Sequence, residues 1–467
     1  MTSRLAATIN ALKAILFTPI ALLVLLTTAA AVVSVIWLLS LRPSRVGEIR
    51  TSADQRCEQV LYDLRDGNFA GVVAQLDAAA KAQLSADQLQ AGWDSGTFLL
   101  GQLSGWKLAQ SQSSGGLQIR LYDLTFEHGS LLLTIAVNGA GEVDELQSHT
   151  VHDSDPVTTP PYANPHAFKA ESVTVGSPPN VCDGILTIPT AAHALFPAAV
   201  LVAGSGPNDK DESIGPNHPL ADIAEGLSTR GIVMLRYDKR TYSHEKFDPA
   251  RFTVEQEYLE DAAVAVALLR RRPDVDRNRI FIIGHSEGAV LAPEIAKRAA
   301  PVAGVIMLAP AAAPLLLTDI VIRQQRYWGA PPARIAEIEE VRHEINSGKL
   351  PPGQMVSLLG ALYPVGYLTD LKGRDEIEIA RHLGVPILIM HGGRDWQVVD
   401  QDIAAWRTGL KGTPNVTFRE FPSLNHLFIA GTGLPTPVEY ASAGHVDDPV
   451  VLAIADFIWQ RPSIVSN

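Results

Sequence analysis

The stretch Ile280-Phe281-Ile282-Ile283-Gly284-His285-Ser286-Glu287-Gly288-Ala289 decides how the rest of this 467-residue chain is interpreted. An apolar, β-branched run leads into Gly-X-Ser-X-Gly, and an alanine-rich helical pattern follows. This order predicts a strand, a sharp turn and a helix, the setting in which a serine is presented as a nucleophile. The helix N-terminus would add unpaired N–H groups where negative charge develops during acyl transfer. The alternative is that Ser286 merely caps the helix.

In this setting a serine nucleophile is followed along the chain by an acid and then by a histidine. The strand pattern Val385–Met390 leads to a loop with Asp395, and the pattern Val416–Phe421 leads to a loop with His426. Both loops would lie beyond the carboxyl ends of strands, where open α/β sheets build their sites. We therefore predict that Ser286 attacks a carbonyl, His426 transfers its proton, and Asp395 orients the imidazole.

Other side chains compete for the roles of acid and base. Asp400 is the nearest other acid, and Asp395 could instead cap the next helix. His445 is a second candidate for the base, and we favour His426 over it. His391 lies so close to the end of its strand that a structural role is favoured.

The oxyanion formed in acyl transfer needs two backbone N–H groups directed at one point. Glu287, directly after the serine, would supply one of them. The other is expected after an earlier core strand, and Ala198–Ala203 runs into Gly204-Ser205-Gly206-Pro207. We choose Ser205 as the second donor, with Gly206 the next candidate. A phosphate-binding loop is disfavoured here because no Gly-Lys-Ser/Thr follows and no Gly-X-Gly-X-X-Gly spacing occurs.

The composition argues against several other classes of function. The formal net charge is −12, and the chain has no excess of basic residues that would suggest binding to nucleic acid. Two cysteines, Cys57 and Cys182, give neither a disulfide framework nor a zinc ligand set. We expect no metal and no cofactor, and the sequence does not indicate the oligomeric state.

Residues 14–41 contain no charged side chain over 28 positions. As a helix they would extend about 42 Å, against roughly 30 Å for the hydrocarbon core of a membrane. A cleaved signal peptide is the alternative, since Ala29-Ala30-Ala31 offers small residues, but cleavage would leave Val32–Leu41 as an apolar terminus. We predict that residues 1–50 are an N-terminal membrane anchor with 14–41 as its transmembrane helix. We expect the catalytic domain to lie outside the cytoplasm. Basic residues flank the apolar stretch on both sides, so their distribution does not determine the orientation.

Residues 51–150 are expected to form a small α+β domain. Helical spacing occurs at Asp54–Leu64 and Phe69–Leu84, and hairpin-like alternation at Leu117–Phe126 and Leu131–Val137. The proline-rich residues 151–167 then indicate a linker.

Residues 168–467 alternate between strand and helix patterns. The strand candidates are Glu171–Val175, Cys182–Ile188, Ala198–Ala203, Ile232–Arg236, Arg279–Gly284, Ala303–Leu308, Val385–Met390 and Val416–Phe421. They predict an eight-stranded, mostly parallel sheet covered by helices on both faces. The segment of about residues 311–383 is longer than one connection between neighbouring strands needs. Helical patterns occur within it at Pro314–Trp328 and Ala333–Ile345. A lid over the serine is one interpretation, and helices that only pack is the other.

The charged run Tyr237-Asp238-Lys239-Arg240 follows one of these strands. Such a run usually forms a solvated loop or an internal ion-pair network. Its place at the expected catalytic edge of the sheet also allows a role in supporting the site. We favour the structural interpretation.

Together these residues resemble the α/β-hydrolase superfamily, and more narrowly the bacterial EstD-like esterases of the dienelactone-hydrolase-like and acyl-peptidase-like (peptidase S9-like) branch. That group carries an N-terminal domain of unknown function before the hydrolase. The matching stretches are Val202-Ala203-Gly204-Ser205-Gly206-Pro207-Asn208-Asp209, Gly215-Pro216-Asn217, Leu235-Arg236-Tyr237-Asp238-Lys239-Arg240-Thr241, Gly284-His285-Ser286-Glu287-Gly288, Gly392-Gly393-Arg394-Asp395-Trp396-Gln397-Val398 and Leu424-Asn425-His426-Leu427-Phe428. The chain departs from many relatives at Ala203, where they carry histidine, and at Lys210, where arginine is usual.

The resemblance implies an α/β-hydrolase fold, a triad on Ser286, Asp395 and His426, and hydrolysis of short acyl esters without a cofactor. We therefore expect a membrane-anchored serine hydrolase that cleaves carboxylic esters through an acyl-enzyme, with a small-molecule ester as substrate and no nucleic-acid partner. An acyl-peptide or exopeptidase-like hydrolase and an acyl thioesterase are alternatives that share the triad. A non-catalytic binding protein on a hydrolase fold is a more remote one.

Overall fold

The computed structural model describes residues 51–81, 84–97, 100–114, 116–127, 129–150, 157–191, 195–243, 248–312, 317–327, 332–358, 361–436, 439–440 and 442–461. The predicted membrane anchor at residues 14–41 lies outside the described residues. Within the ranges just given, no helix is long and apolar enough to cross a membrane.

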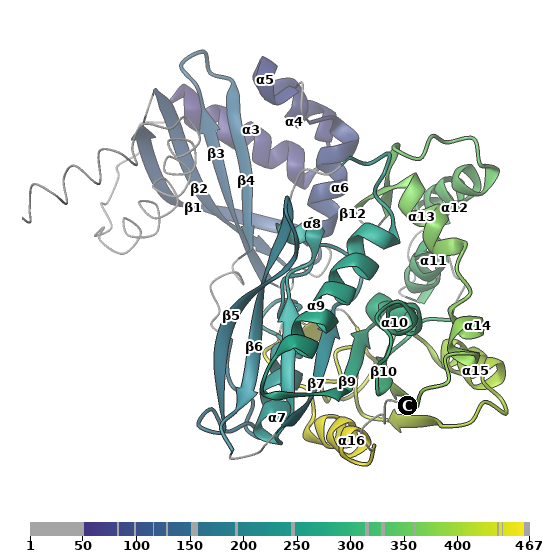
Figure 1. Ribbon diagram of the computed structural model, residues 1–467. Helices are drawn as coiled ribbons and strands as arrows, with labels where there is room; N and C mark the ends of the chain where they lie inside the picture. Colours follow the sequence, from purple (N-terminus) through teal and green to yellow (C-terminus); the bar gives the residue numbers. More distant parts are fainter. Residues whose placement is uncertain are drawn as a thin grey trace, which may run out of the picture. The chain divides into compact units, whose positions relative to one another are not determined.

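Eight strands form the main sheet, in the order β14-β13-β10-β9-β7-β8-β6-β5 (Figure 1). Their bounds are β5 Phe168–Ser177, β6 Asn180–Pro189, β7 Phe196–Val202, β8 Val233–Tyr237, β9 Val275–His285, β10 Gly304–Leu308, β13 Ile387–Gly392 and β14 Val416–Phe421. All eight strands predicted from the sequence are present. β6 runs antiparallel to β5 and β8, and every other pair in this sheet is parallel. The mostly parallel α/β sheet is therefore confirmed.

The central strands are covered on both faces. Every residue of β7, β8, β10 and β13 is buried, as expected for parallel strands that read as continuous apolar runs. The main helices that follow β7, β8, β9, β13 and β14 are, in that order, α7 Pro219–Thr229, α9 Glu260–Arg271, α10 Glu287–Arg298, α15 Asp400–Gly409 and α16 Asp448–Trp459. Right-handed crossovers place α9 and α10 on one face and α7 on the other, because the step from β7 to β8 runs opposite to the later steps. α16 packs beside α7.

An insertion separates β10 from β13, as the length of that segment predicted. It contains α11 Leu317–Tyr327, α12 Pro332–Ser347, β11 Met355–Leu358, β12 Ala361–Pro364, α13 Val365–Lys372 and α14 Glu376–Arg381. The first two helices match the two predicted ones. The antiparallel pair β11–β12 was not predicted, because strands of four residues are too short to show a period.

Residues 52–150 form a smaller sheet with its own helices and its own core. The helices are α3 Ser52–Arg65, α4 Phe69–Gln75, α5 Ala78–Lys81 and α6 Ala86–Thr97, and the strands are β1 Leu103–Ser114, β2 Leu117–Phe126, β3 Gly129–Val137 and β4 Val143–Thr150. The strands pair in chain order, all antiparallel. Side chains of α3, β2 and β3, such as Leu61, Leu124 and Ile135, fill this separate core. The predicted hairpin corresponds to β2 and β3.

One predicted helix of this part, Phe69–Leu84, is broken in two. Leu76 adopts an extended conformation and bridges to Val143 of β4. The side chain of Asp77 then accepts the N–H of Ala80 at 2.7 Å and starts α5. The apolar spacing continues across the break, so periodicity alone could not reveal it.

The described part of the predicted linker, residues 157–167, lies along α7. The Tyr162 ring lies beneath the Arg230 guanidinium at 5.6 Å, and the Asn164 N–H donates to Thr229 Oγ1 at 2.9 Å. This half of the proline-rich stretch is therefore packed against the larger sheet's helices.

Candidate active site

Ser286 stands on a sharp turn between β9 and α10, as the glycine pattern predicted. Its φ of +53° lies in the left-handed region, a conformation that costs a non-glycine residue on the order of 1–3 kcal/mol. A Cβ on Gly284 would lie 2.2 Å from the Gly288 carbonyl oxygen, and one on Gly288 would lie 2.5 Å from that of Val202. The Ser286 N–H is held by the Leu308 carbonyl at 2.9 Å. Strand contacts on both sides therefore fix the strained serine.

His426 and Asp395 form a buried pair. Nδ1 of His426 lies 2.7 Å from Oδ2 of Asp395, and both side chains are almost fully shielded from solvent. Oδ1 of Asp395 accepts the N–H groups of Gln397 and Val398 at 2.8 and 2.9 Å. Because Nδ1–H donates to the carboxylate, Nε2 is the ring nitrogen left for proton transfer.

The competing residues are placed elsewhere. Asp400 begins α15 with its side chain 91% exposed. His445 binds Asp222 at 2.9 Å. His391 donates from Nε2 to the Val398 carbonyl at 2.9 Å and so holds the loop that carries Asp395. The structure thus pairs His426 with Asp395 and gives the other two histidines separate structural partners.

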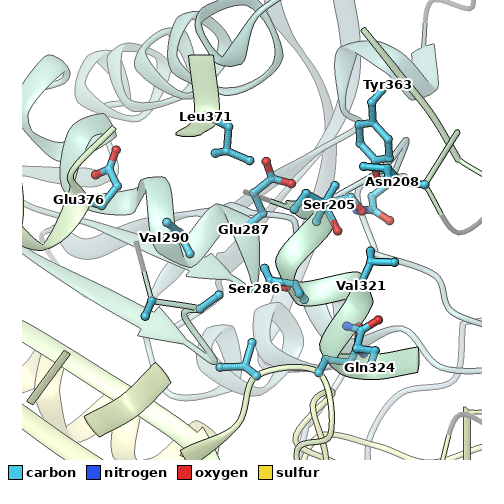
Figure 2. A pocket seen from close by; sticks show the side chains of 18 of the residues that line it. Ser205, Asn208, Ser286, Glu287, Val290, Val321, Gln324, Tyr363, Leu371 and Glu376 are labelled. Atoms are coloured by element: carbon cyan, nitrogen blue, oxygen red, sulfur yellow. The ribbon is translucent and has the colours of Figure 1, made fainter. Parts of the chain in front are cut away.

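A cavity of about 330 Å³ opens at the serine (Figure 2). Ser286 and both predicted oxyanion residues, Ser205 and Glu287, line it together. The inserted segment supplies much of the remaining wall, namely Leu317, Ile320, Val321, Gln324, Leu358, Tyr363, Leu371, Arg374 and Glu376. Of the two predicted helices of the insertion, α11 lines the space next to the serine together with β11, β12, α13 and α14, whereas no described residue of α12 lies in the cavity wall.

His285, the residue before the serine, bridges two parts of the site and was not singled out from the sequence. Nδ1 lies 2.9 Å from a carboxylate oxygen of Glu212, and Nε2 lies 3.0 Å from the backbone carbonyl oxygen of His426. Burial, the largest single effect, lowers the pKa of His285, but the Glu212 carboxylate, the His426 carbonyl and the charge of Asp395 together raise it by more, so the net pKa is above its ordinary value. Since both partners accept hydrogen bonds, the imidazolium satisfies both.

Glu212 also holds residues 204–207, the loop that carries the predicted oxyanion donor Ser205 and is called the oxyanion loop below. Its second carboxylate oxygen accepts the Gly204 N–H at 2.6 Å, and its own φ is +52°. In the sequence, the histidine inside the serine motif is the one feature that points to the hydrogen bond between Glu212 and His285. The residues around Glu212 give no indication that it pairs with a histidine 73 positions away.

The carbonyl of Gly204 is anchored by three donors. Lys239 Nζ, the Tyr258 hydroxyl and Asn208 Nδ2 lie 2.8, 2.7 and 3.0 Å from this oxygen. The Gly204 carbonyl and the Ser205 N–H belong to one planar peptide unit and point in opposite directions. Anchoring the oxygen therefore also fixes the direction of the Ser205 N–H.

The charged run after β8 has both of the roles considered for it. Asp238 binds Lys210 at 3.0 Å, and Arg240 binds Asp261 at 2.6 Å, which are structural ion pairs. Lys239, in contrast, is buried against the oxyanion loop, with Glu257 as its counter-charge at 3.2 Å. Lys239 therefore makes the contact that the second interpretation, a role in supporting the site, requires.

Comparison with known proteins gives several matches. Over 407 residues the chain is 39% identical to Esterase EstD of Thermotoga maritima, covering 86% of this chain and 94% of that esterase. Residues 218–336 match the family described as Serine aminopeptidase, S33. Among solved structures, Est1E from Butyrivibrio proteoclasticus is 15% identical, with a TM-score of 0.42 over 62% of this chain and 98% of that one. The hyperthermophilic esterase from Pyrobaculum calidifontis is 16% identical, with a TM-score of 0.41 over 62% and 85%.

Proposed function

Because this chain belongs to the EstD esterase family and is a carboxylic ester hydrolase, we propose that it cleaves short-chain acyl esters through an acyl-enzyme formed on Ser286. One observation carries the proposal. Ser286, in its strained conformation, lines a cavity together with the two oxyanion candidates, Ser205 and Glu287. His285, next to the serine, binds the loop of His426, whose ring forms a buried pair with Asp395 at 2.7 Å.

In the proposed reaction the Ser286 hydroxyl attacks the ester carbonyl while Nε2 of His426 takes its proton. Asp395 stabilises the imidazolium through its bond to Nδ1. The tetrahedral intermediate collapses with loss of the alcohol, which receives the proton from His426. A water molecule, deprotonated by the same nitrogen, then attacks the acyl-enzyme. The bond to Ser286 breaks, the carboxylic acid leaves, and His426 returns the proton to the Ser286 oxygen.

The N–H groups of Ser205 and Glu287 would stabilise the oxyanion in both tetrahedral intermediates. Glu287 is the first residue of α10, so its N–H has no partner within the helix. The Ser205 N–H is oriented by the anchored Gly204 carbonyl. Removing one such donor from an acyl-transfer enzyme typically lowers kcat by about 10²–10³-fold.

A short acyl group is favoured by the size of the cavity. Its volume of about 330 Å³ is at the lower end of the roughly 300–1,000 Å³ found for small-molecule sites. Apolar side chains from α10 and from the insertion, such as Val290, Ile320 and Leu371, supply much of its wall. Chains of a few carbons would fill this space, whereas long fatty acyl chains would exceed it.

Labelling and turnover test this proposal together. The full chain in detergent is treated with a fluorophosphonate, and the modified peptide is mapped. Turnover is then measured on p-nitrophenyl esters from acetate to dodecanoate. We expect modification at Ser286 and highest kcat/KM for chains of about two to six carbons. Labelling at another serine, or highest kcat/KM for the dodecanoate ester, would contradict the assignment.

We also propose that residues 14–41 anchor the enzyme in a membrane with the catalytic part outside the cytoplasm. The support is the length of 28 uncharged positions and the apolar character of the stretch. The full chain should remain with membranes after carbonate extraction, and protease added to intact cells with a permeabilised outer layer should digest the catalytic part. Release of the chain by carbonate would contradict the anchor. Protection of the catalytic part from the protease would indicate the opposite orientation in the membrane.

A further inference from the structure

Helix α11 presents to the cavity a face that is apolar except at one position. Leu317, Ile320, Val321 and Gln324 all line the cavity at Ser286. Their spacing of three, four and seven residues is that of one face of a helix, and such a face is usually apolar throughout when it is buried. Gln324 carries an amide although its exposed fraction is only 6%. A polar side chain thus stands where the apolar stripe would continue, in the wall of the reaction space.

The Gln324 amide forms no hydrogen bond to another of the described residues. Neither of its polar atoms is fully enclosed, in contrast to the unpaired Nε of its neighbour Arg323. Because Gln324 is largely buried and lines the cavity, the space to which its amide is exposed is the cavity. The N–H donors and the carbonyl acceptor of this amide are therefore available to a bound molecule.

The other two side-chain amides in the described cavity wall hold the protein together. Asn208 Nδ2 donates to the carbonyls of Gly204 and Ser205 at 3.0 Å each, and Gln397 Nε2 donates to a tyrosine hydroxyl at 2.9 Å. Gln324 has no such structural bond. A methionine or leucine in its place would extend the apolar stripe without the cost of burying a polar group. The fold itself therefore gives no reason for this glutamine.

This part of α11 is attached to the loop that follows Asp395. Arg323 donates to the Gln397 carbonyl at 3.3 Å, and Gln397 in turn donates its backbone N–H to Asp395 at 2.8 Å. In the proposed reaction Asp395 orients His426, and His426 passes its proton to the alcohol that leaves. The alcohol part of the ester would therefore lie toward this loop, which is also the side of Gln324.

On the basis of the proposed esterase function, we propose that Gln324 is a specificity-determining residue that binds a neutral hydrogen-bonding group, a hydroxyl or a carbonyl, on the alcohol part of the ester. An amide suits such a group because it both donates and accepts without carrying charge. In Figure 2 Ser286 lies between Gln324 and Val290, so the amide faces the serine from the side opposite this apolar residue.

A charged group is disfavoured at this position. Among the residues that the structure describes, α11 contributes no charged side chain to the cavity wall. The neighbouring cation, Arg323, is already paired with Asp402 at 2.8 Å. An ammonium or a carboxylate on the substrate would thus lose its hydration without gaining a counter-charge.

Paired acetate esters test this assignment. They are the monoacetates of the linear diols from ethane-1,2-diol to hexane-1,6-diol, each beside the alkyl acetate in which a methyl group replaces the free hydroxyl. Release of acetic acid is followed by titration at constant pH. At the chain length that reaches Gln324, kcat/KM should be about tenfold higher for the hydroxyl ester, the effect of one neutral hydrogen bond. Acetylcholine should be a poorer substrate than 3,3-dimethylbutyl acetate, which has the same shape without the charge.

A second series tests the acyl side. Ethyl 3-hydroxypropanoate and ethyl 6-hydroxyhexanoate are compared with ethyl butanoate and ethyl heptanoate. These hydroxyl esters should show no advantage over their alkyl partners, because the acyl chain would lie away from Gln324.

Variants of α11 then locate the preference. Gln324→Met keeps the length of the side chain and removes the amide, so it should abolish the hydroxyl preference while keeping turnover of the alkyl acetates. Gln324→Glu keeps the shape and adds a negative charge, so it should raise kcat/KM for acetylcholine relative to 3,3-dimethylbutyl acetate. Using both variants prevents a folding defect in one of them from deciding the result. Arg326→Met, at an exposed position of the same helix, is the matched control and should change neither ratio.

The outcomes separate this inference from the esterase proposal. Loss of the hydroxyl preference in Gln324→Met, with the control unchanged, would support the assignment. Turnover of alkyl acetates without a hydroxyl preference at any chain length, a preference on the acyl side only, or a preference that survives in Gln324→Met would overturn it and leave the esterase function intact. Absence of turnover of every ester would overturn the proposed function, and this assignment with it.

Discussion

Nε2 of His285 lies 3.0 Å from the backbone carbonyl oxygen of His426, so the residue next to Ser286 holds the loop that carries His426. The other ring nitrogen is held by Glu212, which also binds the Gly204 N–H. A single buried carboxylate therefore connects the oxyanion loop, the serine turn and the histidine loop. These three segments come from separate parts of the chain, and the proposed mechanism requires that they be held in fixed relative positions.

The first prediction concerns the nucleophile. Ser286→Ala should lower kcat/KM for p-nitrophenyl butyrate by about four to six orders of magnitude, because no other group forms the acyl-enzyme. Ser205→Ala is the matched control, since its proposed role uses the backbone N–H, which alanine keeps. It should retain most of the activity. Equal losses in the two variants, or an active Ser286→Ala enzyme with an unchanged melting temperature, would contradict the assignment.

The second prediction separates the two histidine candidates. His426→Ala should lose activity about as completely as Ser286→Ala, because the triad acts as a unit. His445→Ala should keep most of its turnover and lose about 1–3 kcal/mol of stability, since Asp222 stays buried with one partner fewer. Steady-state kinetics and urea unfolding of both variants check this. A collapse of turnover in the His445 variant without unfolding would show that the base was misassigned.

The third prediction is a pH dependence of stability that arises from His285. Its pKa is raised above the ordinary 6.5 in the folded state. The imidazolium–carboxylate bond to Glu212 therefore stabilises fully below pH 6.5, and this stabilisation is lost as the pH rises through the higher folded value. The difference in unfolding free energy between wild type and Glu212→Gln should be largest near pH 6 and shrink toward pH 9. Urea titrations across that range measure it, and a difference that grows with pH would refute the charged pair.

The fourth prediction concerns the anchored Gly204 carbonyl. Tyr258→Phe removes one of its donors and keeps the ring, so the Ser205 N–H is less well oriented and kcat should fall roughly tenfold with little change in KM. Tyr237→Phe, which removes a buried hydroxyl at the end of the neighbouring strand β8, serves as the control for general effects on packing. An increase in KM alone would indicate that Tyr258 shapes the binding cavity instead.

The features that the sequence predicted are those with a local signature. The strand patterns before Ser286 and Asp395 are continuous apolar runs because both strands are buried on both faces. Gly284 and Gly288 are required by backbone contacts within a few ångströms of the turn. The order of acid and histidine after the serine predicted Asp395 and His426, and the structure places Oδ2 of the first 2.7 Å from Nδ1 of the second.

The features that it missed depend on contacts between distant segments. Glu212 and His285 are 73 residues apart, and Lys239 reaches Gly204 across 35 residues, with no pattern around either partner to suggest the pair. Strands β1 and β4 were missed because their polar sequences lack the alternation that marks a strand with one buried face. The break at Leu76 has the same origin, because its partner Val143 belongs to a distant strand.

The three hydrogen bonds that the Gly204 carbonyl accepts come from the protein itself, so the peptide is oriented before any ester enters. Lys239 and Tyr258 are buried, and in the proposed mechanism neither would have to move when the tetrahedral species forms. A reversible inhibitor that mimics this species, such as a boronic acid, should thus engage the oxyanion loop without a slow rearrangement of that loop. In the proposed mechanism the hydrogen-bond donors that hold Gly204 are therefore arranged when the chain folds, and no free energy is needed to rearrange them in each turnover.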